Sequence, residues 1–206
     1  MRTLVIETAT AACSVALLEN GSVLDFRHEV VGRGHAERLV PMIAELPDAG
    51  RADRILVDCG PGSFTGVRVG LAAARGLAIG WQAEVVGFSS LALVAAGAFA
   101  ATASEDAFAV VLEGGHGEVF MQEFTADPLT PLGIFGSLRP EAALARLGGR
   151  RAVGNGVHRL LALRPELHAA EALPDARDAR LLPAPLATLA PRPLYGRAPD
   201  AKPPQS

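Results

Sequence analysis

The sequence predicts an α/β fold made of two related halves, with a sheet that is antiparallel at one edge and parallel beyond it. Three strand-like runs in succession open the chain, and helical and strand-like segments then alternate. Such alternation is typical of parallel strands joined by helices. From residue 107 a second hairpin is followed by a helix, a strand and a helix, which we interpret as a shortened copy of the first half.

Apolar runs predict the three opening strands at 3–7, 13–18 and 23–31. A polar turn at 8–12 joins the first two, and residues 19–22 carry the Asn-Gly signal of a hairpin between the last two. These three strands form a meander, which explains the antiparallel edge of the sheet.

The apolar residues of 34–46 recur with a helical period. Pro41 lies inside this segment, so we expect the helix to begin late or to bend there. A linker at 47–53 then leads to a strand at 54–59.

A glycine-rich turn follows that strand and leads into a long helix, predicted at 64–81. Ser63 or Thr65 can cap this helix. The stretch is not a Walker A loop, because the Lys-Ser/Thr ending is absent, and it also lacks the GxGxxG spacing.

Gly62, Gly66 and Gly70 recur every four residues and clear one face of the helix of side chains. Each glycine inside a helix costs about 1 kcal/mol relative to alanine. We therefore expect something to pack very close to this face: a phosphate, the chain's own sheet, or a second protein.

The remaining segments follow from the same periodicities. They are a strand at 84–88, a helix at 89–101, a hairpin of 107–113 and 118–125, a loop or weak strand at 128–136, a short helix at 140–147, a strand at 151–154 and a helical segment at 157–163. From residue 181 onward the chain holds seven of its fifteen prolines. We expect a first subdomain at 1–104, a reduced second subdomain at 105–180 and a proline-rich, mostly extended and partly disordered tail at 181–206.

The composition limits the classes of function. A net charge of −3 argues against broad electrostatic capture of nucleic acid. Cys13 and Cys59 lie within apolar runs, which predicts buried free thiols in a reducing cytoplasm. The first residues run directly into a strand, so no leader is expected. The uncharged stretch 85–104 is rich in alanine, glycine and serine, and we interpret it as a buried βα unit in preference to a membrane span.

Polar side chains near the strand ends are the candidates for chemistry. Thr8, Thr10 and Ser14 could offer hydroxyl groups to a phosphate, although an ordinary polar hairpin is the alternative. Glu7 and Asp58 lie near the ends of two strands, either as a paired-carboxylate site or as satisfied edge carboxylates. The five histidines are scattered without metal-ligand spacing, and no nucleophile elbow is present, so we expect no metal site and no catalytic residue.

The motif Gly-Pro-Gly-Ser-Phe-Thr-Gly-Val-Arg-Val-Gly at 60–70 resembles the signature of the bacterial TsaB (YeaZ) family. The resemblance continues, in order, in four further segments: 1–17, 35–43, 85–91 and 117–120. It covers most of residues 1–124, and residues 193–197 resemble a looser version of the family's C-terminal motif.

The resemblance implies an actin/Hsp70/sugar-kinase-like (ASKHA) fold of two βββαβα-type halves, the second shortened. It also implies a role in forming threonylcarbamoyladenosine beside the anticodon of tRNA. In that pathway the metal-bearing paralogue TsaD transfers the threonylcarbamoyl group, and TsaB is a non-catalytic partner that holds TsaD, with the ATPase TsaE joining them. The implied subunit is cytoplasmic, contacts no membrane, has no cofactor of its own, meets ATP or ADP in the complex, and reaches tRNA only through the complex.

Two features of the sequence agree with a scaffold. The catalytic paralogue carries metal histidines spaced His-x-x-x-His just after the strand at 84–88, whereas this chain has Ser-Ser-Leu-Ala-Leu at 89–93. The second half is also short for an ATPase that closes two full domains over nucleotide. The alternatives are a nucleotide-dependent enzyme or a glycoprotease-like member of the same superfamily.

The resemblance further implies that the helices at 35–46 and 64–81 bind TsaD or a second copy of the chain. The predicted partner interface is Leu39, Met42, Ile43, Val67, Leu71 and Ala74, and the turn that positions its helix is Gly60, Gly62, Ser63, Gly66 and Gly70. Replacing Leu71 or Ala74 with Arg is expected to abolish association and leave the fold intact. The alternative is that this face packs on the chain's own sheet.

Residues 113–116, Glu-Gly-Gly-His, depart from the family's pattern. They are similar to a nucleotide-binding loop of the catalytic paralogue, and we interpret them as a flexible hairpin in preference to a phosphate site.

Overall fold

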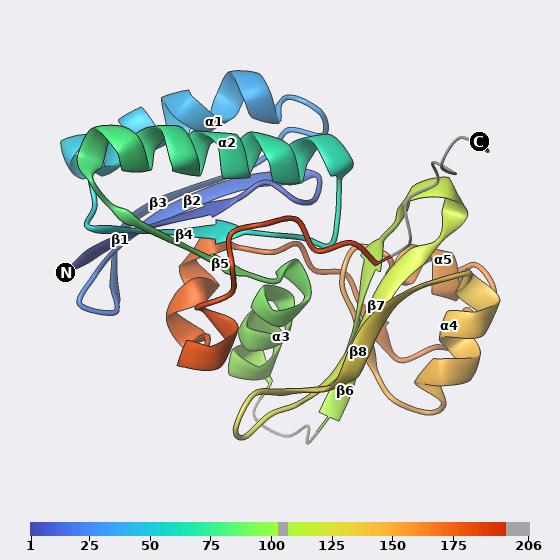
Figure 1. The fold of residues 1–206 in the computed structure, drawn as a ribbon. Helices are drawn as coiled ribbons and strands as arrows, with labels where there is room; N and C mark the ends of the chain where they lie inside the picture. The colour runs from blue at the N-terminus through green and yellow to red at the C-terminus, as the bar shows by residue number, and fades with distance from the viewer. Residues whose placement is uncertain (103–106, 197–206) are drawn as a thin grey trace, which may run out of the picture.

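The computed structural model describes residues 1–102 and 107–196, which form two lobes, each built on a five-stranded sheet (Figure 1). In the first lobe the strand order is β3-β2-β1-β4-β5. The strands are β1 Arg2–Glu7, β2 Ala12–Glu19, β3 Ser22–Val30, β4 Arg54–Asp58 and β5 Glu84–Phe88. The strand order of the second lobe is β10-β9-β6-β7-β8. Its strands are β6 Ala107–Glu113, β7 Val119–Thr125, β8 Thr130–Leu138, β9 Ala152–Val153 and β10 Ala169–Ala170.

The two sheets have the same topology. Within each lobe, the spatial order is third, second, first, fourth and fifth strand of that lobe. The first three strands pair antiparallel, the fourth pairs parallel with the first, and the fifth pairs parallel with the fourth. The prediction of two related halves, the second shortened, is therefore confirmed, with β9 and β10 reduced to two residues each.

Helices cover the sheets in layers. The helices are α1 His35–Ala44, α2 Phe64–Trp81, α3 Ser90–Ala101, α4 Pro140–Leu147 and α5 Val157–Leu161. The first two pack on the outer face of the first sheet, and the last two pack on the outer face of the second. The remaining helix, α3, lies between the two lobes (Figure 1).

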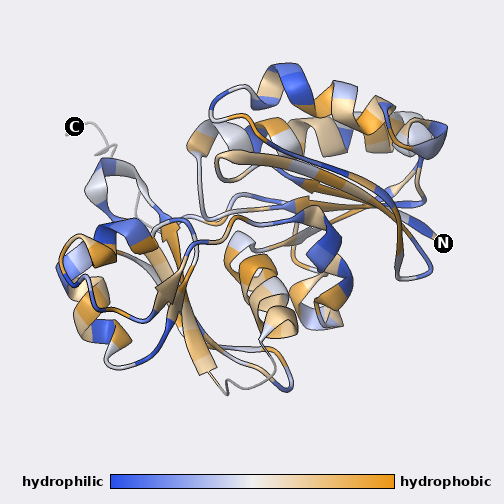
Figure 2. Cartoon of the chain, turned by 180° about the vertical axis from the view of Figure 1, so that it is seen from behind, coloured by the Kyte–Doolittle hydropathy of each residue, from blue (hydrophilic) through white to orange (hydrophobic). Residues whose placement is uncertain are grey.

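The apolar character of α3 explains its position. Figure 2 shows this helix hydrophobic along its length, and a helix that is apolar all round is normally buried. It packs in one core cluster with Val5 and Leu56 from the first sheet and with Phe108 and Val110 from the second. The two lobes therefore share a core, and this core spans the boundary expected near residue 104.

Three local features refine the sequence-based expectations. The helix α1 begins at His35 and contains Pro41 within one continuous segment, so it does not begin late. The segment expected as a loop or weak strand at 128–136 is the strand β8. The strand β10 was not predicted.

Within the described part of the chain no helix is both long and apolar enough to cross a bilayer. The stretch from 85 to 102 forms most of β5 and then α3, which confirms the expected βα unit.

The segment 187–196, called the strap below, runs extended beside β5 and then along the glycine-rich turn (Figure 1). The Gly87 and Leu189 backbones exchange two hydrogen bonds of 2.7 and 2.9 Å, and Leu194 N donates to Cys59 O at 2.8 Å. Two short 3-10 helices, Ala176–Leu181 and Ala184–Leu186, precede the strap. The strap is thus an extended part of the proline-rich tail, and the open edge of β5 supplies its backbone partners. Residues 197–206 lie outside the described residues.

Candidate functional site

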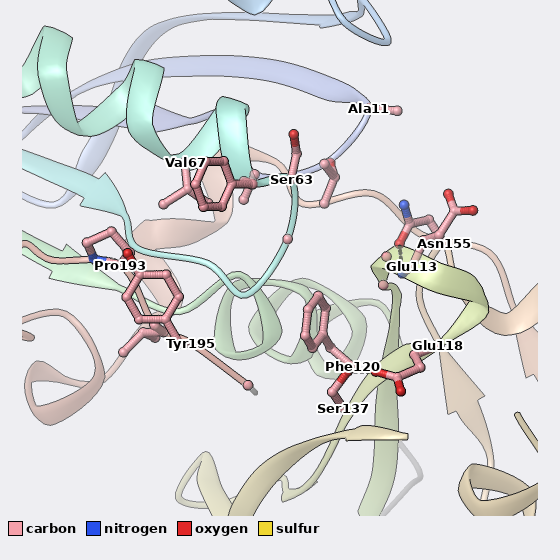
Figure 3. Close-up of a pocket in the computed structure, with 18 of the residues that line it drawn as sticks. Ala11, Ser63, Val67, Glu113, Glu118, Phe120, Ser137, Asn155, Pro193 and Tyr195 are labelled. Atoms are coloured by element: carbon pink, nitrogen blue, oxygen red, sulfur yellow. Dashed lines mark hydrogen bonds between the residues drawn. The ribbon is translucent and has the colours of Figure 1, made fainter. Parts of the chain in front are cut away.

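A cleft of about 810 Å³ lies between the two lobes. The first lobe contributes the β1–β2 turn and the start of α2, the second contributes the β6–β7 turn, and the strap closes one end. Figure 3 shows Ser63 and Val67 on one wall, Glu113 and Asn155 on the other, and Tyr195 at the strap.

The glycine-rich turn is held against the β1–β2 turn of the same lobe. Ser63 Oγ accepts a hydrogen bond from Gly66 N at 3.2 Å and caps α2, as predicted for one of the two candidate caps. A Cβ on Gly62 would lie 2.0 Å from Ala9 O, and a Cβ on Gly66 would lie 2.0 Å from Thr8 O.

A Cβ on Gly70 would similarly lie 2.5 Å from Thr8 Oγ1. The predicted close approach is therefore confirmed. Of the three candidates for the close neighbour, the structure selects the chain's own first strand and turn.

The hydroxyl groups proposed to meet a phosphate lie in different places. Thr8 is buried and its Oγ1 donates to Gly66 O at 2.8 Å. Ser14 is also buried, and its Oγ donates to Arg27 O and accepts from Ala176 N. Only Thr10 lines the cleft. The prediction of Thr8 and Ser14 as nucleotide contacts is therefore wrong, because packing within the lobe covers them.

On the second-lobe wall the carboxylates already have partners. Glu113 Oε1 accepts from Arg159 at 2.7 Å, and Glu118 accepts from Ser137 Oγ at 2.6 Å. The β6–β7 turn contains a short 3-10 segment, Gly115–Gly117, with His116 at a positive φ of 56°. This turn lines the cleft as a hairpin.

An aromatic and arginine cluster borders the cleft at the strap. The Arg68 guanidinium lies 3.2 Å from the centroid of the Phe64 ring and donates a hydrogen bond of 2.9 Å to Tyr195 Oη. Phe64 and Tyr195 are both more than half exposed. The cleft position of Tyr195 was not anticipated, since the sequence places it far from the first lobe.

The six residues predicted to form the partner interface are buried within the lobe. Their exposed fractions run from 0 to 5%: Leu39, Met42, Ile43, Val67, Leu71 and Ala74. They belong to the cluster that joins α1 and α2 to the first sheet. Burial contradicts the prediction that these side chains contact a partner, and arginine at Leu71 or Ala74 would disrupt the core.

The exposed side of the same two helices carries a set of small and apolar residues next to the charged Glu37, Glu45 and Arg75. We call it the outer helix face and define it by these residues: Ala36, Val40 and Ala44 of α1, and Ala72, Gly76, Ile79 and Gly80 of α2. Ile79 is 83% exposed and Val40 57%. No described atom would lie within 4 Å of a Cβ added to Gly76 or Gly80. Sequence reasoning missed this second pair of glycines, although its four-residue spacing was visible.

Glu7 and Asp58 form a buried pair beneath the turns that line the cleft. Their exposed fractions are 0 and 1%. Burial raises the pKa of Asp58 to about 7, against hydrogen bonds from Gly60 and Ser90 that lower it. Burial and the nearby Asp58 charge raise the pKa of Glu7 well above its usual range. Neither side chain lines the cleft, so the pair is not an open catalytic site.

Residues 89–93, where the resemblance led us to look for metal histidines, form the start of α3. Ser89 is its N-cap, and Ser90 Oγ donates to Asp58 Oδ1 at 2.8 Å. Among residues 1–102 and 107–196, no group of three His, Cys, Asp or Glu side chains is placed to hold a metal ion.

Curated relatives include proteins of a tRNA modification pathway. The tRNA threonylcarbamoyladenosine biosynthesis protein TsaB of Escherichia coli (strain K12) is 38% identical over 132 residues, which are 62% of this chain and 56% of that protein. TsaB of Haemophilus influenzae is 41% identical over 113 residues, 52% of this chain and 48% of that protein. The chain thus spans about half the length of these relatives. A family model described as TsaD, tRNA N6-adenosine threonylcarbamoyltransferase, matches residues 27–128.

Two lobes of one topology around a cleft define a protein of the actin/Hsp70/sugar-kinase-like class. A solved Pseudomonas aeruginosa structure, described as an uncharacterised protein similar to the peptidase YeaZ, superposes with a TM-score of 0.80. It is 30% identical to this chain, and the match covers 95% of this chain and 99% of that one. The chain belongs to the TsaB/YeaZ family.

Proposed function

We propose that the chain is a non-catalytic scaffold subunit in tRNA threonylcarbamoyladenosine biosynthesis, and that it binds a TsaD-like transferase through the outer helix face. The observation that carries the proposal is the exposed glycine pair of α2, with Ile79 beside it. The names of the curated relatives support the pathway.

The outer helix face lowers the stability of the isolated protein. Gly76 and Gly80 each destabilise α2 by about 1 kcal/mol relative to alanine, and no described atom lies where a side chain on either would project. An exposed Ile79 adds apolar surface that water solvates poorly. A partner helix packed against this face offsets both, since glycine lets two helix axes approach to about 8 Å.

The cleft supports a scaffold in preference to an enzyme. Its two second-lobe carboxylates are paired with Arg159 and Ser137, and the Ser63 hydroxyl caps α2. We propose that ATP or ADP enters this region only in the assembled complex, that a TsaE-like ATPase joins it, and that tRNA is reached through the partner. This assignment places the protein in the cytoplasm.

The direct test is complex formation with the TsaD-like transferase of the same organism. Size-exclusion chromatography with light scattering should give a heterodimer with the wild-type chain and none with Ile79→Arg. Ile134→Arg is the matched control, because Ile134 is 85% exposed but lies on β8 of the second lobe. A complex retained by Ile79→Arg would contradict the proposed surface. A wild-type homodimer that persists in the presence of the transferase and is lost in Ile79→Arg would show that a second copy occupies this face.

The cellular test addresses the pathway. Depletion of the protein should lower threonylcarbamoyladenosine in bulk tRNA, measured by mass spectrometry of nucleosides. Restoration by the wild type and by Ile134→Arg, but not by Ile79→Arg, is the expected pattern. Normal modification after depletion would refute the proposed function.

A further inference from the structure

Glu7 and Asp58 each leave one buried carboxylate oxygen without a partner. Glu7 Oε1 accepts from Ala9 N at 2.7 Å, and Asp58 Oδ1 accepts from Gly60 N at 2.6 Å and from Ser90 Oγ. Within the described chain, Glu7 Oε2 and Asp58 Oδ2 have no hydrogen-bond partner and no access to solvent. A buried charged oxygen in that state is strongly disfavoured.

The two side chains are neighbours across β1 and β4. These strands are parallel and pair Ile6 with Val57, so Glu7 and Asp58 follow directly in adjacent positions. Neighbouring strands lie about 4.8 Å apart. Side chains alternate along a strand, and Val5 and Leu56, two residues earlier, both face the α3 core. The two carboxylates therefore lie on the same face.

We propose that Glu7 and Asp58 share one proton, held in a hydrogen bond between the two oxygens that otherwise lack a partner. The proton replaces two unpaired acceptors with one donor–acceptor pair and leaves a single negative charge on the pair. The start of α3 faces this charge, because Ser90 donates to Asp58, and a helix N-terminus favours a negative charge.

The groups around the pair strengthen its hold on the proton. Asp175, the N-cap of the 3-10 helix Ala176–Leu181, is a further carboxylate that acts on Glu7, and its own charge is compensated by Arg177 at 2.7 Å. His28 of β3 lies 3.7 Å from Asp175.

Two thiols near the pair belong to the core cluster on the other face of the first sheet. Cys13 of β2 and Cys59, which follows β4, are buried, and burial raises the pKa of each thiol, to about 12 and to about 11. Both thiols therefore stay neutral at physiological pH and add no charge to the pair.

The shared proton affects the first-lobe wall of the cleft, because each carboxylate holds one of the turns that form this wall. Glu7 holds the β1–β2 turn at Ala9 N, and Asp58 holds the glycine-rich turn at Gly60 N. Ser63 N donates to Ala9 O at 2.6 Å and joins the turns. Loss of the proton places two like charges side by side. The resulting repulsion acts on both turns, so the first-lobe wall of the cleft loosens as pH rises.

Carboxyl carbon NMR of the full-length chain, titrated with acid and base, tests the shared proton directly. The Glu7 and Asp58 signals should change together in one step near neutral pH and again at acidic pH, as coupled groups do. Two independent steps, each near the ordinary values of about 4, would overturn the proposal. So would a step that disappears when sodium or magnesium chloride is added, because a bound cation would then occupy the site.

Urea unfolding as a function of pH gives a second readout. The folded pair retains a proton that the unfolded chain releases, so the wild-type urea midpoint should fall from about pH 5 to about pH 8. In Glu7→Gln the amide N–H takes the place of the shared proton, and that fall should disappear.

Glu123→Gln is the matched control, because Glu123 is buried but its ion pair with Arg146 keeps it charged. The Glu123→Gln variant should have a lower urea midpoint than the wild type, and this midpoint should still decrease between about pH 5 and about pH 8. A fall of the same size in Glu7→Gln would overturn the proposal. If Glu7→Gln does not fold, the wild-type NMR titration decides.

Discussion

Gly66 and Gly76 lie on the same helix in opposite surroundings. A Cβ on Gly66 would meet the Thr8 carbonyl oxygen at 2.0 Å, whereas a Cβ on Gly76 would enter open space. We expect Gly66→Ala to destabilise the fold by about 2 kcal/mol or more, as overpacking against backbone does. Gly76→Ala should stabilise it by about 1 kcal/mol through helix propensity. Urea unfolding of both variants measures the difference, and equal effects would contradict this description of α2.

The same Gly76→Ala variant separates stability from assembly. A methyl group at Gly76 projects from the outer helix face, where the proposed partner helix approaches. Titration calorimetry with the TsaD-like transferase should show weaker binding by a more stable protein. Unchanged affinity would show that the partner contacts another surface.

The ion pair of Glu123 and Arg146 gives a residue-scale prediction with the opposite pH dependence from Asp58. Burial of Glu123 favours the neutral acid, but two hydrogen bonds from Arg146, of 2.9 and 2.6 Å, outweigh it and lower the pKa. Its contribution is therefore present at neutral pH and is lost as pH falls through the lowered pKa. Arg146→Met should cost about 2 kcal/mol at pH 7 and less at pH 3. A loss that is the same at both pH values in thermal unfolding would contradict this.

At the residue scale the sequence predicted what each glycine permits but not what lies opposite it. The spacing of Gly62, Gly66 and Gly70 indicated close approach, and the neighbour proved to be the β1–β2 turn. The prediction of the interface residues placed them on the wrong face for a physical reason. Apolar residues such as Leu39 and Leu71 at helical spacing mark the face that packs on the sheet, whereas the exposed face carries small residues of weaker signal.

At the scale of elements, composition predicted the extended course of the strap but not its partners. Proline removes backbone donors and breaks regular structure, so a proline-rich segment reads as extended. The partners that order it are the backbone groups of Gly87 and Cys59, which a composition cannot reveal. The apolar pattern of β8 is weak for a similar reason, since Pro131, Gly133 and Gly136 interrupt it.

Removal of the strap should expose the outer edge of β5. A chain that ends at residue 186 loses the two hydrogen bonds at Gly87 and the bond to Cys59 O. We expect faster amide exchange at Gly87 and a lower melting temperature than in a chain that ends at residue 196, which keeps the strap. Equal protection of Gly87 in the two chains, measured by hydrogen exchange, would show that the strap contributes nothing to this edge.

At the scale of the molecule, the order of elements predicted two halves, but the joining of the halves depends on α3. Phe88 at the end of β5 and Phe108 on β6 belong to one buried cluster around that helix. Its uniformly apolar sequence indicated burial, but the second surface that buries it is made by strands that come later in the chain. The sequence alone therefore could not show that the lobes share a core.

A shared core predicts one cooperative unfolding transition. Differential scanning calorimetry of the full-length chain should give a single peak whose calorimetric and van't Hoff enthalpies agree. The isolated segment 1–104 should not fold stably, because the second-lobe side of α3 would face water. Two separate peaks, or a stable isolated first lobe, would contradict the shared core.

The pairing of the strap with β5 also has a consequence for the growing chain on the ribosome. The five strands of the first sheet are complete once Phe88 has been added, but Leu189 and Leu194 are made long afterwards. While the second lobe is being synthesised, the edge of β5 is therefore an open row of backbone donors and acceptors. Such an edge can pair with another nascent chain. Chains terminated before residue 187 should accordingly associate with one another, whereas full synthesis closes the edge from within.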